Sequence, residues 1–175
     1  MTFTTKFDPA HNIMTLNGVP VSLHCHHYNC GLLQVIEKFP RIDAHNILIR
    51  TAAEEFCQNF KSYLADQLRG CTKADALRQA ADLYRVMGFG RIDLSQLKEE
   101  GGTAVADSSY FVVGWLAKYG RRPNPVCFVT CGFIAGILAA VFNALPETYE
   151  VKETDCLVTG GECCTFSVRR RHDGH

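Results

Sequence analysis

The sequence predicts an α+β fold, in which an antiparallel sheet packs against several helices. Apolar residues recur at helical spacing through most of the first half of the chain. The pattern changes to alternation after Gly88-Phe-Gly90, and a Gly-Gly pair near the C-terminus lies between two strand-like runs. Segregated helices and strands of this kind favour a sheet covered by helices over a parallel βαβ arrangement.

The helical segments have recognisable ends. Pro40 predicts the end of a helix that includes Leu32 and Ile36. Asp43 is placed to cap a long helix over residues 43–69, which Gly70 terminates. Three further segments have helical periodicity or a long apolar run, namely 72–87, 109–119 and 126–145.

Strand candidates show alternating polarity or turn signals. Residues 3–22 predict two short strands, with Asn17-Gly18 as a hairpin turn. Gly101-Gly102 predicts another turn, and Gly160-Gly161 predicts a hairpin turn. The remaining strands are expected at 91–97, 103–108, 151–158 and 164–168.

Length and composition predict one domain, with an N-terminal extension over about residues 1–22 and a core over about 23–168. The 175 residues are 47% hydrophobic, and the formal net charge is zero, which leaves no electrostatic footprint for nucleic acid or an anionic membrane. The N-terminus lacks the pattern of a signal peptide, and the apolar run 126–142 fits a buried helix better than a membrane span. We therefore expect a cytoplasmic protein, in which nine cysteines serve metal binding, redox chemistry or packing.

The C-terminal hairpin can bring metal ligands together. Glu153 and Cys156 lie on its first strand and Cys164 opens the second. Paired strands lie roughly 5 Å apart, so Cys156 and Cys164 can converge. A further thiol must come from elsewhere, and the preceding apolar segment offers both Cys127 and Cys131.

The order of motifs resembles the 4-vinyl reductase domain family. This family includes hydrocarbon-binding proteins and the sensor domains of phenol- and xylene-responsive transcription activators. The resemblance covers roughly residues 23–168 and is most specific in the C-terminal third. It rests on Met87-Gly-Phe-Gly90 with the following Arg91-Ile-Asp-Leu94, Val105-Ala-Asp-Ser-Ser109, Cys127-x4-Gly132-Phe133-x2-Gly136, Glu153-x2-Cys156-x3-Gly160 and Cys164-x-Phe166-x-Val168.

The resemblance implies a structural zinc site of three cysteines and one glutamate. Its ligands would be Glu153, Cys156 and Cys164, with Cys127 as the fourth and Cys131 as the alternative. The wider superfamily is similar in fold to haem-based nitric-oxide sensors and to Golgi-transport tethering subunits. The resemblance therefore implies a ligand-binding scaffold, commonly a homodimer, without implying an activity.

A second group of candidate ligands lies in the first half of the chain, where His24, Cys25, His26, His27 and Cys30 fall within seven residues. In a helix, His26 shares a face with Cys30, and His24 with His27; in an extended segment His24 shares a face with His26. Imidazole and thiolate ligands would suit a second transition metal or a tetrapyrrole cofactor. Packing is the alternative role for these side chains.

The family resemblance also implies an internal pocket for a small apolar molecule. We expect aromatic residues to line it, although such residues build ordinary cores more often. The lining candidates are Phe56, Phe60, Phe111, Trp115, Phe128 and Phe133.

Three functions are consistent with these expectations. The first is a zinc-stabilised binding domain for a small apolar or aromatic molecule, acting as a stand-alone sensor or carrier with a separate regulatory partner. The second is a reductase-like enzyme that uses the segment from His24 to Cys30 together with a metal or tetrapyrrole and a redox partner. The third is a structural assembly subunit.

Overall fold

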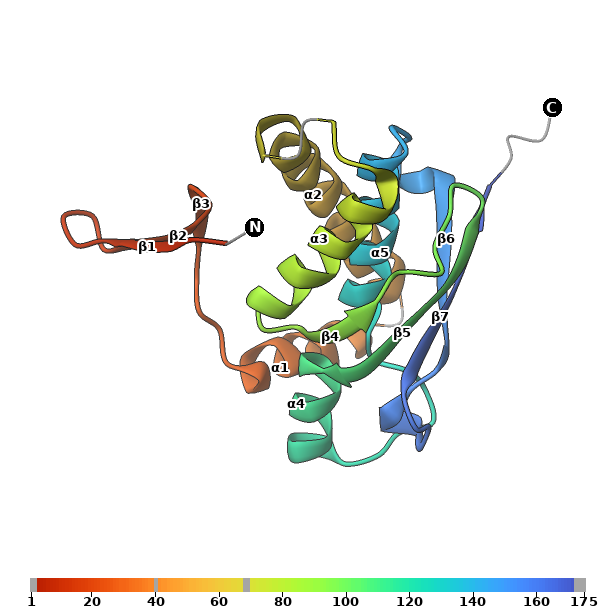
Figure 1. Cartoon of the computed structure of the whole chain (residues 1–175). Coiled ribbons are helices and arrows are strands. Elements are labelled where there is room, and N and C mark those ends of the chain that lie inside the picture. Colours follow the sequence, from red (N-terminus) through yellow and green to blue (C-terminus); the bar gives the residue numbers. More distant parts are fainter. Residues whose placement is uncertain (1–2, 40, 68–69, 172–175) are drawn as a thin grey trace.

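The computed structural model describes residues 3–39, 41–67 and 70–171, and it confirms the α+β fold. Its main sheet is antiparallel with the strand order β4-β5-β7-β6. Helices α3 and α5 lie on one face of this sheet and α2 lies beyond α5 (Figure 1). The strands are β4 (Gly90–Asp93), β5 (Gly101–Ser109), β6 (Tyr149–Asp155) and β7 (Cys164–Arg170), and the helices are α1 (His26–Glu37), α2 (Ala44–Gln67), α3 (Lys73–Val86), α4 (Tyr110–Tyr119) and α5 (Phe128–Val141).

The sheet buries one face, as period-two alternation requires. On β5, Ala104 and Ala106 are fully buried, and on β7 the side chains of Cys164, Phe166 and Val168 point into the same core. This burial places the Cys164 side chain between the sheet and the helical layer.

The packing of α5 against α2 depends on two glycines. A Cβ atom at Gly132 would lie 2.3 Å from the carbonyl oxygen of Ile49, and one at Gly136 would lie 2.5 Å from that of Ala53. These are backbone atoms and cannot move aside. The two helices therefore approach more closely than any larger residue at these positions would allow.

Most helix ends agree with the sequence signals. Thr72 caps α3, accepting a hydrogen bond from the amide of Asp75 at 3.1 Å. The clearest difference is at α5, which ends at Val141 instead of residue 145. The helix that contains Leu32 and Ile36 begins at His26, so His24 lies outside it. The predicted stop at Pro40 and the predicted end of the long helix at residues 68–69 lie outside the described residues.

Several strand predictions were wrong in detail. The predicted strand 91–97 ends at Asp93, and Gly101-Gly102 opens β5 instead of forming a turn. The chain does not reverse at a two-residue Gly160-Gly161 turn. After Asp155 it forms a short 3₁₀ helix, η2 (Leu157–Thr159), and the left-handed Gly160 (φ 108°) follows. The β6–β7 connection is thus a compact loop, folded partly by amide hydrogen bonds from Thr159 and Gly161 to the Cys156 carbonyl.

The N-terminal segment forms three strands where two were predicted, namely β1 (Thr5–Asp8), β2 (Ile13–Leu16) and β3 (Val19–Val21). Asn17-Gly18 does form a tight turn, between β2 and β3. This small sheet projects to the side of the main body (Figure 1). The remaining short helix, η1 (Pro146–Thr148), precedes β6. Within the described residues, no helix has both the length and the apolar character to cross a bilayer.

Candidate metal centre and neighbouring cavity

Four side chains from different parts of the chain converge between the main sheet and the helical layer. Cys127 immediately precedes α5, Glu153 lies on β6, Cys156 follows β6 and Cys164 is the first residue of β7. The β6–β7 register shifts between Glu153 and Asp155, and the resulting irregularity allows the chain to turn Cys156 toward Cys164. All three sulfurs are fully buried and the carboxylate is partly buried.

The separations match those of ligands around one ion. The potential ligand atoms of Cys127, Glu153, Cys156 and Cys164 all lie within 4.8 Å of one another. The Cys164 sulfur is 3.8 Å from that of Cys127 and 3.7 Å from that of Cys156. Tetrahedral zinc with sulfur bonds of about 2.3 Å requires a sulfur–sulfur separation of about 3.8 Å. These distances are far from the approximately 2.05 Å of a disulfide.

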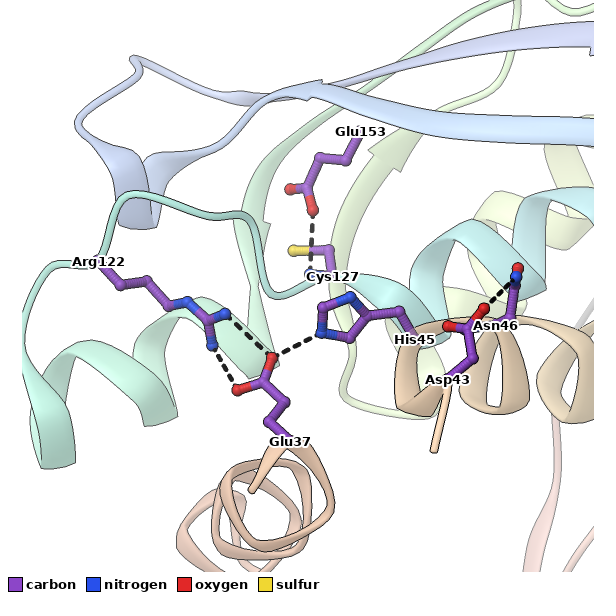
Figure 2. Close-up of polar contacts among 7 residues, drawn as sticks. All are labelled: Glu37, Asp43, His45, Asn46, Arg122, Cys127 and Glu153. Carbon is purple, nitrogen blue, oxygen red and sulfur yellow. Dashed lines mark hydrogen bonds and ion pairs between the residues drawn. The ribbon is translucent and has the colours of Figure 1, made fainter. Parts of the chain in front are cut away.

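The surroundings of Glu153 give further evidence that a metal ion binds here. The Cys127 amide donates to its Oε2 at 3.0 Å (Figure 2). Its other oxygen, Oε1, is buried and has no hydrogen-bond partner among the described residues. Burial raises the pKa of Glu153 to about 8. A buried carboxylate oxygen without a partner is costly, and coordination of a cation would remove that cost.

The thiols also favour binding a cation. Hydrogen bonds from Cys127 and Cys164 lower the pKa of Cys156, which stabilises a thiolate at the centre of the group. The Val158 amide also hydrogen-bonds to the Cys156 sulfur, and Ser109 Oγ lies 3.3 Å from the Cys127 sulfur.

The neighbouring cysteines stay outside this group. Cys131 is buried one helical turn beyond Cys127, and its amide donates to the Cys127 carbonyl at 3.0 Å. The Cys163 sulfur contacts the Thr165 hydroxyl at 3.5 Å. Among the described residues, the group formed by Cys127, Glu153, Cys156 and Cys164 is the only set of three or more ligand-type side chains close enough to share an ion.

The histidine-rich segment does not form one site. His24 is exposed and stacks on Tyr28 with ring centroids 5.1 Å apart. Cys30 is buried, and its sulfur faces the Phe111 carbonyl at 3.5 Å. Only His26 and His27 bring their ring nitrogens together, at 3.2 Å. The expected face shared by His24 and His27 is absent from α1 because the helix starts after His24.

A small cavity of about 110 Å³ adjoins the candidate metal centre. Val126 and Phe128, the two neighbours of Cys127 in the chain, both line it. Asn29 is the only polar side chain among its nine lining residues. The other walls come from Leu32, Leu33, Ile36, Leu48, Phe111 and Val129.

The predicted lining residues lie in different parts of the molecule. Phe111 and Phe128 line this cavity. Phe60 and Phe133 are instead fully buried core residues, and Phe56 packs edge-on against Phe133 at 5.0 Å. Trp115 does not line this cavity; its ring lies 4.5 Å beneath the Arg122 guanidinium carbon.

An ion network that the sequence did not reveal braces the cavity from outside. Glu37 accepts two hydrogen bonds from Arg122, at 2.9 and 3.0 Å, and lies 2.8 Å from His45 Nε2 (Figure 2). The His45 ring stacks on Phe128 at 3.9 Å. The Arg122 amide donates to the Val158 carbonyl in η2 at 3.4 Å. Sequence patterns gave no signal because Glu37 and Arg122 are 85 residues apart.

The fold and this site together define an α+β scaffold with four candidate metal ligands beside an apolar cavity. No protein-family model matches the chain, and no curated protein matches it. Solved structures do match, at sequence identities that establish the fold alone. The phenol-responsive sensory domain of the transcription activator PoxR, solved with phenol, superimposes with a TM-score of 0.78 at 14% identity, over 95% of this chain and 84% of that one.

Two other neighbours have the same fold. A vinyl-4-reductase family protein from Methanocaldococcus jannaschii matches with a TM-score of 0.58 at 14% identity, over 87% of this chain and 84% of that one. Trafficking protein particle complex subunit 3 from Naegleria fowleri, covalently bound to palmitic acid, matches with a TM-score of 0.54 at 15% identity, over 83% of this chain and 93% of that one. The suspected resemblance to the 4-vinyl reductase family is thus confirmed at the level of fold.

Proposed function

We propose that the chain is a zinc-stabilised binding domain for a small apolar or aromatic molecule, acting as a stand-alone sensor or carrier in the cytoplasm. Residues 1–175 would act as one domain. The observation that carries the proposal is the position of Cys127, whose two neighbours line the apolar cavity. An ion that holds Cys127 in place would also hold the cavity wall.

The chemistry of the ligand set supports zinc. Soft thiolates favour zinc over magnesium or calcium, and a closed four-ligand set without an open position is typical of a structural site. Three thiolates and one carboxylate exceed the charge of the ion, and the Val158 amide on the Cys156 sulfur helps to offset this excess.

The cavity supports a ligand of about one aromatic ring. A cavity of about 150 Å³ is known to hold benzene, so about 110 Å³ accommodates a single ring after small shifts of the walls. Asn29 can offer a hydrogen bond to one polar group, and the other lining residues are apolar. The likeness to the sensory domain solved with phenol supports the same class of ligand.

Phenol and toluene titrated into the zinc-loaded full chain, followed by calorimetry, test the proposal. We expect Val129→Phe, which fills the cavity, to abolish binding. Val113→Phe should leave binding unchanged, because Val113 is 57% exposed on α4. If Val129→Phe bound either compound as tightly as the wild type, the ligand would occupy another part of the molecule.

The proposal includes a homodimer, for which the outer face of α1 is the candidate interface. Tyr28, Leu32 and Val35 follow one another at intervals of four and three residues and are each 45–53% exposed. This spacing is that of a helix–helix seam, and the seam carries no charge that would repel a second copy. We expect Val35→Glu, which lies outside the cavity lining, to give a monomer in analytical ultracentrifugation; a wild-type monomer would refute this assignment.

The alternative functions receive less support. A reductase built on the histidine-rich segment needs His24, His26, His27 and Cys30 around one cofactor, whereas these side chains face three different surroundings. The fold likeness to a trafficking complex subunit leaves an assembly role as the outcome if the protein binds neither zinc nor a small molecule. A sensor would act through a separate regulatory partner.

A further inference from the structure

A pair of imidazole rings at the start of α1 stands apart from the centre described above. The Nε2 atoms of His26 and His27 lie 3.2 Å apart, with ring centroids 4.2 Å apart and planes inclined at 65°. Consecutive residues of a helix point about 100° apart, so their side chains do not normally meet. The convergence of these two nitrogens therefore needs a physical cause.

Contacts with α4 hold the backbone of this segment and the His26 ring in place. The Tyr110 hydroxyl donates to the His24 carbonyl at 2.9 Å and accepts from Asn29 Nδ2 at 2.9 Å, which anchors the segment on both sides of the pair. Gly114 leaves the space that His26 occupies, since a Cβ there would lie 2.7 Å from the His26 Cβ. The Tyr110 ring also meets His26 edge-on at 6.1 Å. The surrounding fold thus positions the His26 ring, and the His27 ring lies against it with the two Nε2 atoms 3.2 Å apart.

We propose that His26 and His27 form a second metal site, which takes a borderline divalent transition ion such as Zn²⁺. With metal–nitrogen bonds of about 2.05 Å, a nitrogen separation of 3.2 Å corresponds to a ligand–metal–ligand angle of about 100°, close to the tetrahedral value. Neutral imidazole is a common ligand for such ions. This inference does not depend on the proposed function, because no residue of the pair contributes to the other centre.

The site is open, unlike the buried centre. His26 is partly exposed and His27 is exposed, so water or the ligand of another molecule completes the coordination. The Lys118 ammonium approaches the His27 carbonyl at 3.4 Å and repels a cation. The pair therefore binds an exchangeable ion more weakly than three thiolates bind theirs.

Zinc titrated into the zinc-loaded full chain tests the site by calorimetry, with the imidazole nitrogen signals followed by NMR. We expect one further zinc per chain, with shifts confined to the Nε2 signals of two histidines. His27→Ala should weaken this second binding at least about tenfold, because even outer-shell partners of a metal are worth about 10–100-fold. Since His27 is exposed, its loss should leave the fold intact, and His26→Ala should give the same loss of binding.

Two controls separate this site from its neighbours. His24→Ala should leave the second binding unchanged, because its ring stacks on Tyr28. Cys25→Ser should also leave it unchanged, because the exposed thiol beside the pair is not a proposed ligand. Lys118→Gln should strengthen binding. If no second zinc binds, or if His27→Ala binds it as well as the wild type, the two rings share only a hydrogen bond and the inference is wrong.

Discussion

Replacing Cys164 by serine gives the most direct test of the buried centre. The Cys164 sulfur lies within 3.8 Å of both other sulfurs, so this change removes a ligand that contacts both remaining thiols. Cys163→Ser is the matched control. It is the adjacent residue with the same chemistry, but its sulfur contacts only the Thr165 hydroxyl among the hydrogen-bond partners that the structure describes.

The size of the effect follows from the coupling of metal binding to folding. Outer-shell partners are worth about 10–100-fold in metal affinity, or about 1.4–2.8 kcal/mol, and a direct ligand is worth more. An ion that binds only the folded state stabilises that state, so a loss of metal affinity lowers the free energy of unfolding by a corresponding amount. We therefore expect Cys164→Ser to lower the free energy of unfolding by at least about 3 kcal/mol, which corresponds to about 6–12 °C in Tm for a chain of this length.

Elemental analysis and thermal unfolding of the two variants provide the measurement. Cys164→Ser should contain little or no zinc, while Cys163→Ser should retain about one zinc per chain and change stability by less than about 1 kcal/mol. Equal zinc contents and equal unfolding midpoints would mean that the four side chains pack together without binding an ion.

Two further predictions concern parts of the molecule outside the centre. Burial by itself would raise the pKa of Glu37, but hydrogen bonds from Arg122 and His45 outweigh it and lower this pKa below the ordinary 4.5. The stabilisation by the ionised Glu37 carboxylate is therefore present above about pH 4.5 and lost as the pH falls through the lowered pKa. In urea unfolding, Glu37→Gln should lower the free energy of unfolding by about 1–3 kcal/mol at pH 7 and by progressively less from pH 5 to pH 3. A difference that does not depend on pH would contradict this reasoning. Gly136→Ala should destabilise the protein by about 1–3 kcal/mol, because the new Cβ would clash with the Ala53 carbonyl. Gly31→Ala is the control: its Cβ meets only the flexible end of Lys118 at 3.4 Å, so it should be neutral or stabilising by up to about 1 kcal/mol. Similar results for both variants would show that α2 and α5 can separate without cost.

The sequence predicted the fold class and most helices because these depend on local signals. The capping pair of Thr72 and Asp75, the apolar stripes and the alternation along β5 and β7 each act over a few residues. It did not predict how the chain connects β6 to β7. The Cys156 carbonyl accepts hydrogen bonds from the amides of Thr159 and Gly161, and a two-residue turn does not contain this pattern. The glycines at 101 and 102 misled for a similar reason, because Gly101 allows close approach of the β7 backbone at Val168 and Gly102 allows close approach of the loop backbone at Gln96.

The sequence alone therefore determined which residue types were available to bind a metal, and the spacing of Glu153, Cys156 and Cys164 already indicated a shared site. Only the tertiary structure decided that Cys127, and not Cys131, joins them, and that Glu37, His45 and Arg122 brace the wall beside them. The physical reason is distance along the chain. Local preferences act over one or two turns, whereas contacts between residues 26 to 85 positions apart exist only after the helices have packed on the sheet.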